Sequence, residues 1–417
     1  MSSSKKDDGK DKIGQQFGQV RHSIDVDGLN RYLSANVPAI QTPVTVKQFS
    51  YGQSNPTYIL FDPKGTRYVL RKKPPGGLLS STAHAIEREY RIIGALFKYN
   101  QTLPAGSPDA VPVPEVFCLC EDASIVGTSF YIMQFIHGRI FEDYRMLQLP
   151  SKAEREACWK SAITTLAALH RITPEAIGLG DYGGAKAFYT RQMKSLGKVS
   201  AVQAGITDKA TGETVGAIPD IDSFLAWFGI HMPADENTIV HGDYKIDNLI
   251  FHPTEPRVIG ILDWELSTRG HPLSDLANLL QPYSLPCDAS SRGRINDPAL
   301  WEQSRQAGSL LLALGGLSAA DSPVPLEHDL LRTYCIHAKR AYPIPAWTAA
   351  KAWAWFRLAV ISQGIAARNA QGQASSAQAK VYGSKFPVCA KAMFSVIESD
   401  SHDDDAAAAA GTPKPKL

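Results

Sequence analysis

The string VHGDYKIDNLIF at residues 240–251, followed by VIGILDWE at residues 258–265, carries most of the information about the fold of this chain. Apolar, β-rich runs flank a short polar loop, which predicts strands around an exposed turn. The loop and the turn after the last strand hold two acids and an amide, Asp243, Asn248 and Asp263. Asn248 follows Asp243 by five positions, and Asp263 follows Asn248 by 15. A single loop Asp is usually a turn or cap residue, whereas this complete spacing indicates a catalytic loop.

The spacing matches the catalytic loop of phosphoryl-transfer enzymes, where an Asn follows the catalytic Asp by five positions and a metal-binding Asp follows the next strand. Such transfer needs a carboxylate at the attacking hydroxyl and oxygen ligands on Mg²⁺. We predict that Asp243 holds or deprotonates the hydroxyl. Asn248 and Asp263 are predicted to bind Mg²⁺, because amide and carboxylate oxygens suit that ion. His241 is expected to prop the loop, and Lys245 either neutralises phosphate or faces solvent.

The segment HGDYKIDNLIF…GILDWELSTRGHPLSDLANLL resembles the aminoglycoside-phosphotransferase-like family of small-molecule kinases. In that family Gly replaces the Arg of the His-Arg-Asp triplet, and Asp-Trp-Glu replaces Asp-Phe-Gly; this sequence shows both replacements. The likeness spans about residues 40–390. It implies a protein-kinase-like bilobal α+β fold, with a small antiparallel-sheet lobe carrying one helix, a larger mainly helical lobe, and ATP between them.

Three strings resemble one subgroup of this family: FSYGQSNPTYIL, YVLRKKPPGGLLSSTAHAIEREYRII and DWELSTRGHPLSDLANLL. In animals the domain of that subgroup is joined to acyl-CoA dehydrogenase modules, which implies a hydroxyacyl-CoA as the leading phosphate acceptor. Residues 299–397 are not rich in acids that would bind a polycation, and their many aromatic residues suit a flat or apolar ligand, although helix packing also accounts for them. Another small alcohol, such as an aminoglycoside, choline or a sugar, is the alternative acceptor.

The N-terminal lobe is predicted to bind the nucleotide. Its loop Gly52-Gln53-Ser54-Asn55 lies between β-rich runs at 44–50 and 57–61, where backbone N–H groups and hydroxyls could cover the phosphates. The loop lacks the three glycines of a glycine-rich phosphate loop, so a plain hairpin turn is the competing interpretation. The segment Met133-Gln134-Phe135-Ile136 ends the last strand of the lobe. The resemblance implies that its backbone pairs with adenine, and a buried core strand is the alternative.

Two adjacent cations compete for the phosphate contact. Side chains alternate between the faces of a strand, so Arg71 and Lys72 point to opposite sides of the predicted third strand. We expect Arg71 to make the contact, because a guanidinium can grip phosphate oxygens in two places, with Lys72 as the alternative. The resemblance implies that Glu89, on a helix predicted over 81–97 with Ser81 or Thr82 as its cap, orients that cation; Glu87 is the competing acid.

Four parts are expected along the chain: a disordered tail over 1–22, an N-lobe with a preceding helix over 23–136, a helical C-lobe over 137–397 with the catalytic loop, metal site and acceptor site, and a disordered tail over 398–417. Asp275 is predicted to cap a helix, and the resemblance implies that it braces the catalytic loop. Further predicted elements are a strand at 67–71, strands at 116–120 and 129–135, helices at 24–37, 152–170, 223–231, 299–318, 326–342 and 347–369, and a surface excursion over 197–219.

The composition is that of a globular protein, with 44% hydrophobic and 20% charged residues in a chain of 417. The 43 Lys and Arg nearly balance the 41 Asp and Glu, so we expect no nucleic-acid partner and no membrane partner. The six cysteines follow no disulfide or zinc spacing, and no run reaches the roughly 18 apolar residues of a membrane helix. The polar N-terminus lacks a secretory signal. We therefore expect an intracellular protein, cytoplasmic or, if Pro415-Lys416-Leu417 serves as an address like Ser-Lys-Leu, peroxisomal.

Two other functions fit parts of the sequence. A nucleotide-binding pseudokinase or sensor without turnover would explain the degenerate glycine loop and Arg71 in place of Lys, but the intact Asp243, Asn248 and Asp263 argue against it. A protein kinase would need an activation segment with Ala-Pro-Glu after Asp263, and the chain instead runs WELSTRGHPL towards a helix. The sequence therefore predicts a Mg-ATP-dependent phosphotransferase with a small-molecule hydroxyl as acceptor.

Overall fold

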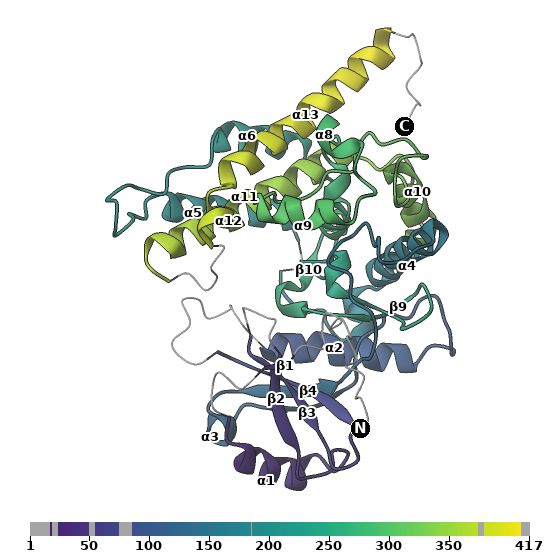
Figure 1. The fold of residues 1–417 in the computed structure, drawn as a ribbon, viewed down its shortest axis with the longest axis vertical. Coiled ribbons are helices and arrows are strands. Elements are labelled where there is room, and N and C mark those ends of the chain that lie inside the picture. Colours follow the sequence, from purple (N-terminus) through teal and green to yellow (C-terminus); the bar gives the residue numbers. More distant parts are fainter. Residues whose placement is uncertain are drawn as a thin grey trace, which may run out of the picture. The chain divides into compact units, whose positions relative to one another are not determined.

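The computed structural model describes residues 17–18, 24–49, 55–74, 86–184, 186–373 and 379–409. The chain forms two compact units (Figure 1). The first contains Met1–Tyr144 and Ile246–Ser267, and the second contains Arg145–Lys245 and Thr268–Leu417. These bounds differ from the single boundary expected at residue 136, because a later stretch of the chain completes the first unit.

The first unit is built on a six-stranded antiparallel sheet with the strand order β1-β2-β3-β4-β6-β5. The strands are β1 Phe17–Gly18, β2 Thr45–Phe49, β3 Thr57–Phe61, β4 Arg67–Lys72, β5 Val116–Cys120 and β6 Phe130–Gln134. All five strands predicted for this lobe are present, and each end lies within one residue of its expected position. They form because each run is rich in β-branched or aromatic residues and is bounded by turn residues.

Three helices belong to the same unit: α1 Val26–Asn36, α2 Ile86–Gln101 and α3 Ala123–Val126. Side chains alternate between the faces of the sheet, so each face meets a different helix. Leu60, Leu70 and Ile132 form a buried core with residues of α1 on one face. The opposite face carries Arg71 and Tyr131 towards α2. Figure 1 shows α1 and α2 on opposite sides of the sheet.

Helix α2 ends four residues later than predicted. Lys98, Tyr99 and Asn100 contain no helix breaker, so the helix continues to Gln101, and Pro104 follows where the chain leaves the helix. The expected first turn at 81–85, with its cap at Ser81 or Thr82, lies outside the described residues.

A hairpin from later in the chain completes the first unit. Its strands β8 (Leu249–Phe251) and β9 (Val258–Ile261) pair antiparallel. Phe251 also exchanges backbone hydrogen bonds of 2.7 and 2.8 Å with Arg139. The adjacent Gly138 approaches so closely that a Cβ there would lie 2.3 Å from the carbonyl oxygen of Phe251. Only glycine fits at this position, so the segment leaving β6 is seated directly on the hairpin.

The second unit is mainly helical and contains one two-stranded antiparallel sheet, β7 Thr238–Val240 with β10 Thr268–Gly270. Its longer helices are α4 Lys152–Arg171, α5 Phe188–Ala204, α6 Ile221–His231, α10 Glu327–Ala338, α11 Trp347–Ala370 and α13 Phe386–Ala409. Its short helices are α7 Leu273–Leu279, α8 Ala289–Arg292, α9 Ala299–Gln306 and α12 Ala379–Gly383. Helix α11 packs against α5, α12 and α13, and α10 packs on α4. A sheet unit and a helical unit make up the expected α+β fold class.

The helix predicted over 299–318 is wrong beyond Gln306. Helix α9 ends there, and Gly308 follows in the left-handed region at φ +72°. The apolar run that comes next is irregular, and its Gly315 lies against the backbone of Leu285, where a Cβ would come within 2.4 Å of the carbonyl oxygen. A buried loop and a buried helix share the same apolar composition, so this run misled the prediction.

Two other boundaries in this unit were placed wrongly. The surface excursion expected over 197–219 is helical as far as Ala204, because α5 already begins at Phe188. The helix expected over 326–342 ends at Ala338, because Lys339 takes the left-handed conformation at φ +56°.

Helix α13 reaches Ala409 and so enters the stretch that we expected to be a disordered tail from residue 398. Alanine has the highest helix propensity of all residues, and a run of alanines begins at residue 406. Residues 410–417, and with them Pro415-Lys416-Leu417, lie outside the described residues.

All six cysteines are free thiols, and five of them are buried. Burial raises the pKa of Cys118 and of Cys389 to about 12, which leaves both as poor nucleophiles. Within the part of the chain that the structure describes, no helix is both long and apolar enough to cross a membrane.

Candidate active site

The residues predicted from the sequence divide between the two units: Arg71, Glu89, Asn248 and Asp263 belong to the first, and Asp243 belongs to the second. In the first unit, the guanidinium of Arg71 joins the large sheet to helix α2 and to the turn after β9. Its Nε lies 3.3 Å from Oε2 of Glu89, and its Nη2 lies 3.3 Å from Oδ1 of Asp263. Oε2 of Glu265 is 3.9 Å from the same nitrogen. Three carboxylates therefore surround one cation.

Glu89 is fully buried and holds its carboxylate in a fixed position. Tyr131 donates its hydroxyl to Oε2 and Asn55 donates its amide to Oε1, both at 2.9 Å. Burial raises the pKa of Glu89, and the charge of Arg71 opposes that rise. Burial would lower the pKa of Arg71, but Glu89 and its neighbours raise it above its ordinary value. The guanidinium is therefore permanently charged, and its orientation is set by Glu89.

The two competing residues lie elsewhere. Lys72 points to the other face of the sheet, where its Nζ donates to the carbonyl of Val126 at 2.5 Å, and burial lowers its pKa. Glu87 pairs with Lys73 at 2.5 Å. The structure thus brings Arg71 and Glu89 together and leaves Lys72 and Glu87 out of the cluster.

Asn248 and Asp263 are 15 residues apart in the sequence, and the β8–β9 hairpin brings them together. The register pairs Leu249 with Ile261. Beyond that pair, the N–H of Leu262 donates to the carbonyl of Asn248 at 2.8 Å. Asp263 comes next in the left-handed conformation at φ +65°, and its side chain is 37% exposed. An amide and an accessible carboxylate therefore stand at one end of a short hairpin.

The chemistry of these donors fits Mg²⁺. The groups near the cluster are carboxylate and amide oxygens, and Oδ1 of Asn55 is buried without a hydrogen-bond partner among the described residues. In the described part of the chain, no three His, Cys, Asp or Glu side chains gather closely enough to hold a metal alone. Mg²⁺ does not need such a cage, because it combines one or two carboxylates with phosphate oxygens and water.

The segment Met133-Gln134-Phe135-Ile136 begins inside the sheet and ends outside it. Met133 is buried and stands opposite Val69. The N–H of Gln134 donates to the carbonyl of Glu115 at 2.8 Å, so that group is not free for adenine. Phe135 and Ile136 follow the last residue of β6. Gly52, Gln53 and Ser54 lie outside the described residues, and Asn55 is the one predicted loop residue inside them.

In the second unit, Asp243 is half-buried between an amide and an ammonium group. Lys245 places its Nζ 3.5 Å from Oδ2, and Asn278 places its Nδ2 3.5 Å from Oδ1. Asn278 also donates to the carbonyl of Tyr244 at 3.1 Å. The N–H of Asp243 donates to Nδ1 of His241 at 3.2 Å, so the ring of His241 binds the backbone of its own loop.

The side chain of Asp275 binds the backbone of the same loop. Its carboxylate accepts the backbone N–H of His241 at 2.7 Å and that of Gly242 at 2.8 Å. These bonds and the nearby His170 lower its pKa despite complete burial. The predicted role as a helix cap is wrong, because Asp275 lies inside α7 and its carboxylate points to the loop. The contact implied by the family resemblance is the one observed.

Sequence reasoning missed three residues around this loop. His170 lies 3.4 Å from Asp275 through Nε2 and 2.7 Å from the hydroxyl of Tyr334 through Nδ1. Asn278 contacts Asp243, and Arg357 donates to the carbonyl of Gly242 at 2.8 Å. The only sequence signal was a polar residue in an otherwise apolar stretch, such as the Asn of DLANLL.

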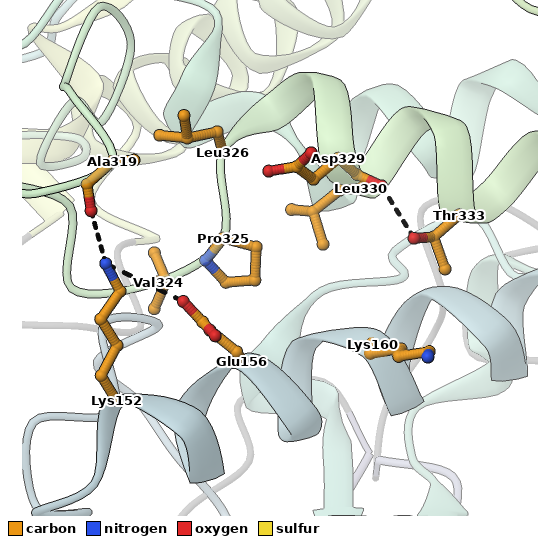
Figure 2. A pocket seen from close by; sticks show the side chains of 10 residues that line it. All are labelled: Lys152, Glu156, Lys160, Ala319, Val324, Pro325, Leu326, Asp329, Leu330 and Thr333. Carbon is orange, nitrogen blue, oxygen red and sulfur yellow. Dashed lines mark hydrogen bonds and ion pairs between the residues drawn. The ribbon is translucent and has the colours of Figure 1, made fainter.

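A pocket of about 250 Å³ opens elsewhere in the second unit, between α4, α10 and the segment before α10 (Figure 2). Figure 2 shows Lys152 on α4 reaching the carbonyl of Ala319 at 2.6 Å and Glu156 at 3.8 Å. None of its lining residues is one that the sequence singled out. This pocket is therefore separate from the candidate active site.

Comparison with known proteins identifies a family. The model of the phosphotransferase enzyme family matches residues 45–308. Acyl-CoA dehydrogenase family member 11 of Rattus norvegicus is 36% identical over 363 residues, which cover 85% of this chain and 41% of that protein. A probable acyl-CoA dehydrogenase of Arabidopsis thaliana is 35% identical over 373 residues, or 86% of this chain and 41% of that protein. The chain thus spans about two fifths of the length of these relatives.

Solved structures agree with the fold. A protein of Ralstonia eutropha, solved as a candidate aminoglycoside phosphotransferase, superposes with a TM-score of 0.71 at 35% identity and covers 90% of this chain and 99% of that one. An ADP-bound aminoglycoside phosphotransferase gives a TM-score of 0.50 at 14% identity, covering 88% and 99%. The second likeness shows the fold alone, which is the predicted kinase-like arrangement of a small sheet and a larger helical part.

Proposed function

The chain belongs to the phosphotransferase enzyme family, and from this premise we propose that it transfers the γ-phosphoryl group of ATP, with Mg²⁺, to a hydroxyl group of a small molecule. The observation that carries the proposal is the cluster around Arg71, where Glu89 fixes the guanidinium 3.3 Å from the carboxylate of Asp263. A charged, oriented guanidinium beside an accessible carboxylate is the arrangement that a Mg-triphosphate needs.

Asn248 and Asp263 would hold Mg²⁺, with Arg71 on the phosphates. Mg²⁺ held by these two residues would supply positive charge against the negative charge that develops during transfer. Glu89 acts through Arg71, because its two hydrogen bonds and its burial keep the guanidinium in place. Backbone groups of Gly52, Gln53, Ser54 and Asn55 would cover the phosphates, and Phe135 and Ile136, after the end of β6, are better adenine partners than Gln134, whose N–H is already engaged.

Asp243 would accept the proton of the attacking hydroxyl or orient it. Its side chain is 30% exposed, so an acceptor hydroxyl can reach the carboxylate. Lys245 lies 3.5 Å from one carboxylate oxygen and Asn278 lies 3.5 Å from the other. Lys245, whose Nζ lies 3.5 Å from Oδ2 of Asp243, would add positive charge near the transferred phosphoryl group. Asp275 binds the backbone N–H groups of His241 and Gly242, and the ring of His241 accepts the N–H of Asp243, so the part of both residues is positioning.

The leading acceptor is a hydroxyacyl-CoA. Support comes from the curated relatives, which carry the name acyl-CoA dehydrogenase and match this chain over two fifths of their length. The alternative is another small alcohol, such as an aminoglycoside, choline or a sugar, and the relative from Ralstonia eutropha supports an aminoglycoside. A role in fatty-acid metabolism follows if the first acceptor is correct.

A direct experiment separates these acceptors. The protein is incubated with Mg-ATP and, in separate reactions, with hydroxyacyl-CoAs of several chain lengths, aminoglycosides, choline and simple sugars. Mass spectrometry then detects an acceptor that has gained one phosphate. Transfer only to hydroxyacyl-CoA supports the leading acceptor, and transfer only to another alcohol replaces it. Binding of Mg-ATP without any phosphorylated product would instead favour a nucleotide-binding module without turnover.

A further inference from the structure

Both backbone polar groups of Gly242 are bound by side chains far away in the sequence. The N–H of Gly242 donates to Oδ1 of Asp275 at 2.8 Å. Its carbonyl oxygen accepts from Nη2 of Arg357, also at 2.8 Å. Gly242 is buried and adopts φ +88°, a conformation that other residues rarely take. The direction in which the chain leaves Gly242 therefore depends on these two contacts.

The contact with Arg357 is the one that bears on Asp243. The carbonyl of Gly242 belongs to the same planar peptide group as the N–H of Asp243. That N–H is bound to Nδ1 of His241 at 3.2 Å. Arg357 and His241 therefore fix one peptide plane at its two polar ends, and the Cα of Asp243 is attached directly to that plane. A rotation of this peptide would swing the carboxylate of Asp243 away from its position.

Arg357 is well placed to resist such a rotation. It lies on α11, a helix whose Trp353, Phe356 and Val360 are buried in the core of the second unit. The bond to Gly242 joins positions 115 residues apart in the chain. A hydrogen bond from a guanidinium to a carbonyl is stronger than one between neutral groups, because the donor is charged.

We propose that Arg357 is a positioning residue for phosphoryl transfer, acting through the carbonyl of Gly242 to aim the carboxylate of Asp243 at the acceptor hydroxyl. The inference rests on the proposed function and adds a residue to it that lies outside the catalytic loop. Helix α11 thereby becomes part of the catalytic apparatus, although none of its side chains needs to touch the nucleotide.

The test compares Arg357→Met and Arg357→Lys with a matched control, Arg368→Met, which removes an exposed arginine from the same helix. With the acceptor that the mass-spectrometric assay identifies, Arg357→Met should lower kcat by about 10- to 100-fold, since small misplacements of a catalytic group have effects of this size. The KM for ATP should stay unchanged. Arg357→Lys should recover part of kcat, because an ammonium can still donate to the carbonyl. Arg368→Met should match the wild type.

A second measurement does not depend on turnover. Hydrogen exchange in the peptide covering residues 240–245 should be faster in Arg357→Met than in Arg368→Met, while exchange in α4 and α10 stays the same. An unchanged kcat in Arg357→Met overturns the proposal. A lower kcat accompanied by a lower Tm, with neither recovered in Arg357→Lys, also overturns it by showing that Arg357 supports only the fold. If the wild type transfers no phosphate to any acceptor, the proposed function fails and the catalytic role fails with it. Unchanged exchange in a protein that does transfer phosphate overturns the role of Arg357 alone.

Discussion

Arg71 and Lys72 are neighbours on strand β4, and their charged groups lie on opposite faces of the sheet. Arg71 meets the buried Glu89 of α2, whereas Lys72 donates to the carbonyl of Val126 at the end of α3. Alternation along a strand produces this separation. A sequence that reads as a run of cations therefore holds one candidate phosphate ligand and one structural lysine.

This difference leads to a matched pair of variants. Arg71→Met should lower the free energy of unfolding by about 3–5 kcal/mol, because it leaves the carboxylate of Glu89 buried and unpaired. Lys72→Met should cost only about 1 kcal/mol, the value of one hydrogen bond. Urea denaturation measures both. The double variant Arg71→Met/Glu89→Gln should regain much of the lost stability yet show no stabilisation by Mg-ATP. Stabilisation by Mg-ATP that survives in this double variant, and disappears in Lys72→Met, would reverse the assignment of the two cations.

Asp243→Asn should remove phosphoryl transfer and preserve the fold and ATP binding. A positioned acid–base group contributes roughly 10²–10⁴-fold, and the amide keeps the shape of the carboxylate. The rate of product formation by mass spectrometry checks this, with Asp222→Asn, an exposed residue of α6, as the control. A rate above about a tenth of the wild type would show that Asp243 is not the acid–base group.

Asp263→Ala should abolish the dependence of ATP binding on Mg²⁺. A ligand at 100 times its Kd stabilises a protein by about 2.7 kcal/mol, which a thermal-shift measurement resolves. The wild type should show this shift with Mg-ATP and lose most of it when EDTA removes the metal. Asp27→Ala, at an exposed position of α1, should behave as the wild type does. A full shift in Asp263→Ala would mean that another group holds the metal.

Acid should destabilise the second unit through His271. Burial lowers the pKa of His271 to about 4. Its Nδ1 accepts the N–H of Leu273, and Glu236 lies 3.6 Å from its Nε2. Because the folded pKa lies below the unfolded value of about 6.5, its stabilisation is complete above pH 6.5 and is lost as the pH falls towards 4. The expected loss is about 2 kcal/mol between pH 7.5 and pH 5.

His271→Asn provides the comparison, since Asn can accept the same backbone N–H. Urea denaturation at several pH values should give a shallower dependence for the variant, with the difference confined to pH 4–6.5. Parallel curves for the two proteins over this range would show that His271 does not titrate as its burial requires.

The sequence predicted much of the local secondary structure around the candidate site. The five strands of the N-lobe were found because alternation and turn residues act over a few positions. The apolar runs that become β8 and β9 were found for the same reason, whereas their pairing as a hairpin was not predicted. The partners of the catalytic loop were not, because Arg357 and Asn278 reach it from 115 and 35 residues away. A polar side chain on a helix carries no local sign of the carbonyl or carboxylate that it will meet.

The missed helix α5 and the overlong helix at 299–318 have a related cause. Residues 188–204 combine polar residues with a glycine at 197 and have no strong apolar stripe, so packing against α11 stabilises this helix more than its own pattern does. The run after Gly308 is apolar, but Gly315 is pressed against the backbone of Leu285 and the chain stays irregular. Tertiary contacts decide the structure in both segments.

The first unit is assembled from two stretches of chain, Met1–Tyr144 and Ile246–Ser267. During synthesis, the ribosome must therefore add about 100 residues of the second unit before the first can be finished. At a translation rate of roughly 5–20 residues per second, about 5–20 s pass between synthesis of the sheet of the first unit and synthesis of its hairpin. During that time Gly138 and the end of β6 lack the surface on which they later lie. A nascent chain halted before residue 246 should consequently expose the region around Gly138 to chaperones. Each unit contains two separate stretches of chain, so dividing the sequence at one position cannot yield either unit whole.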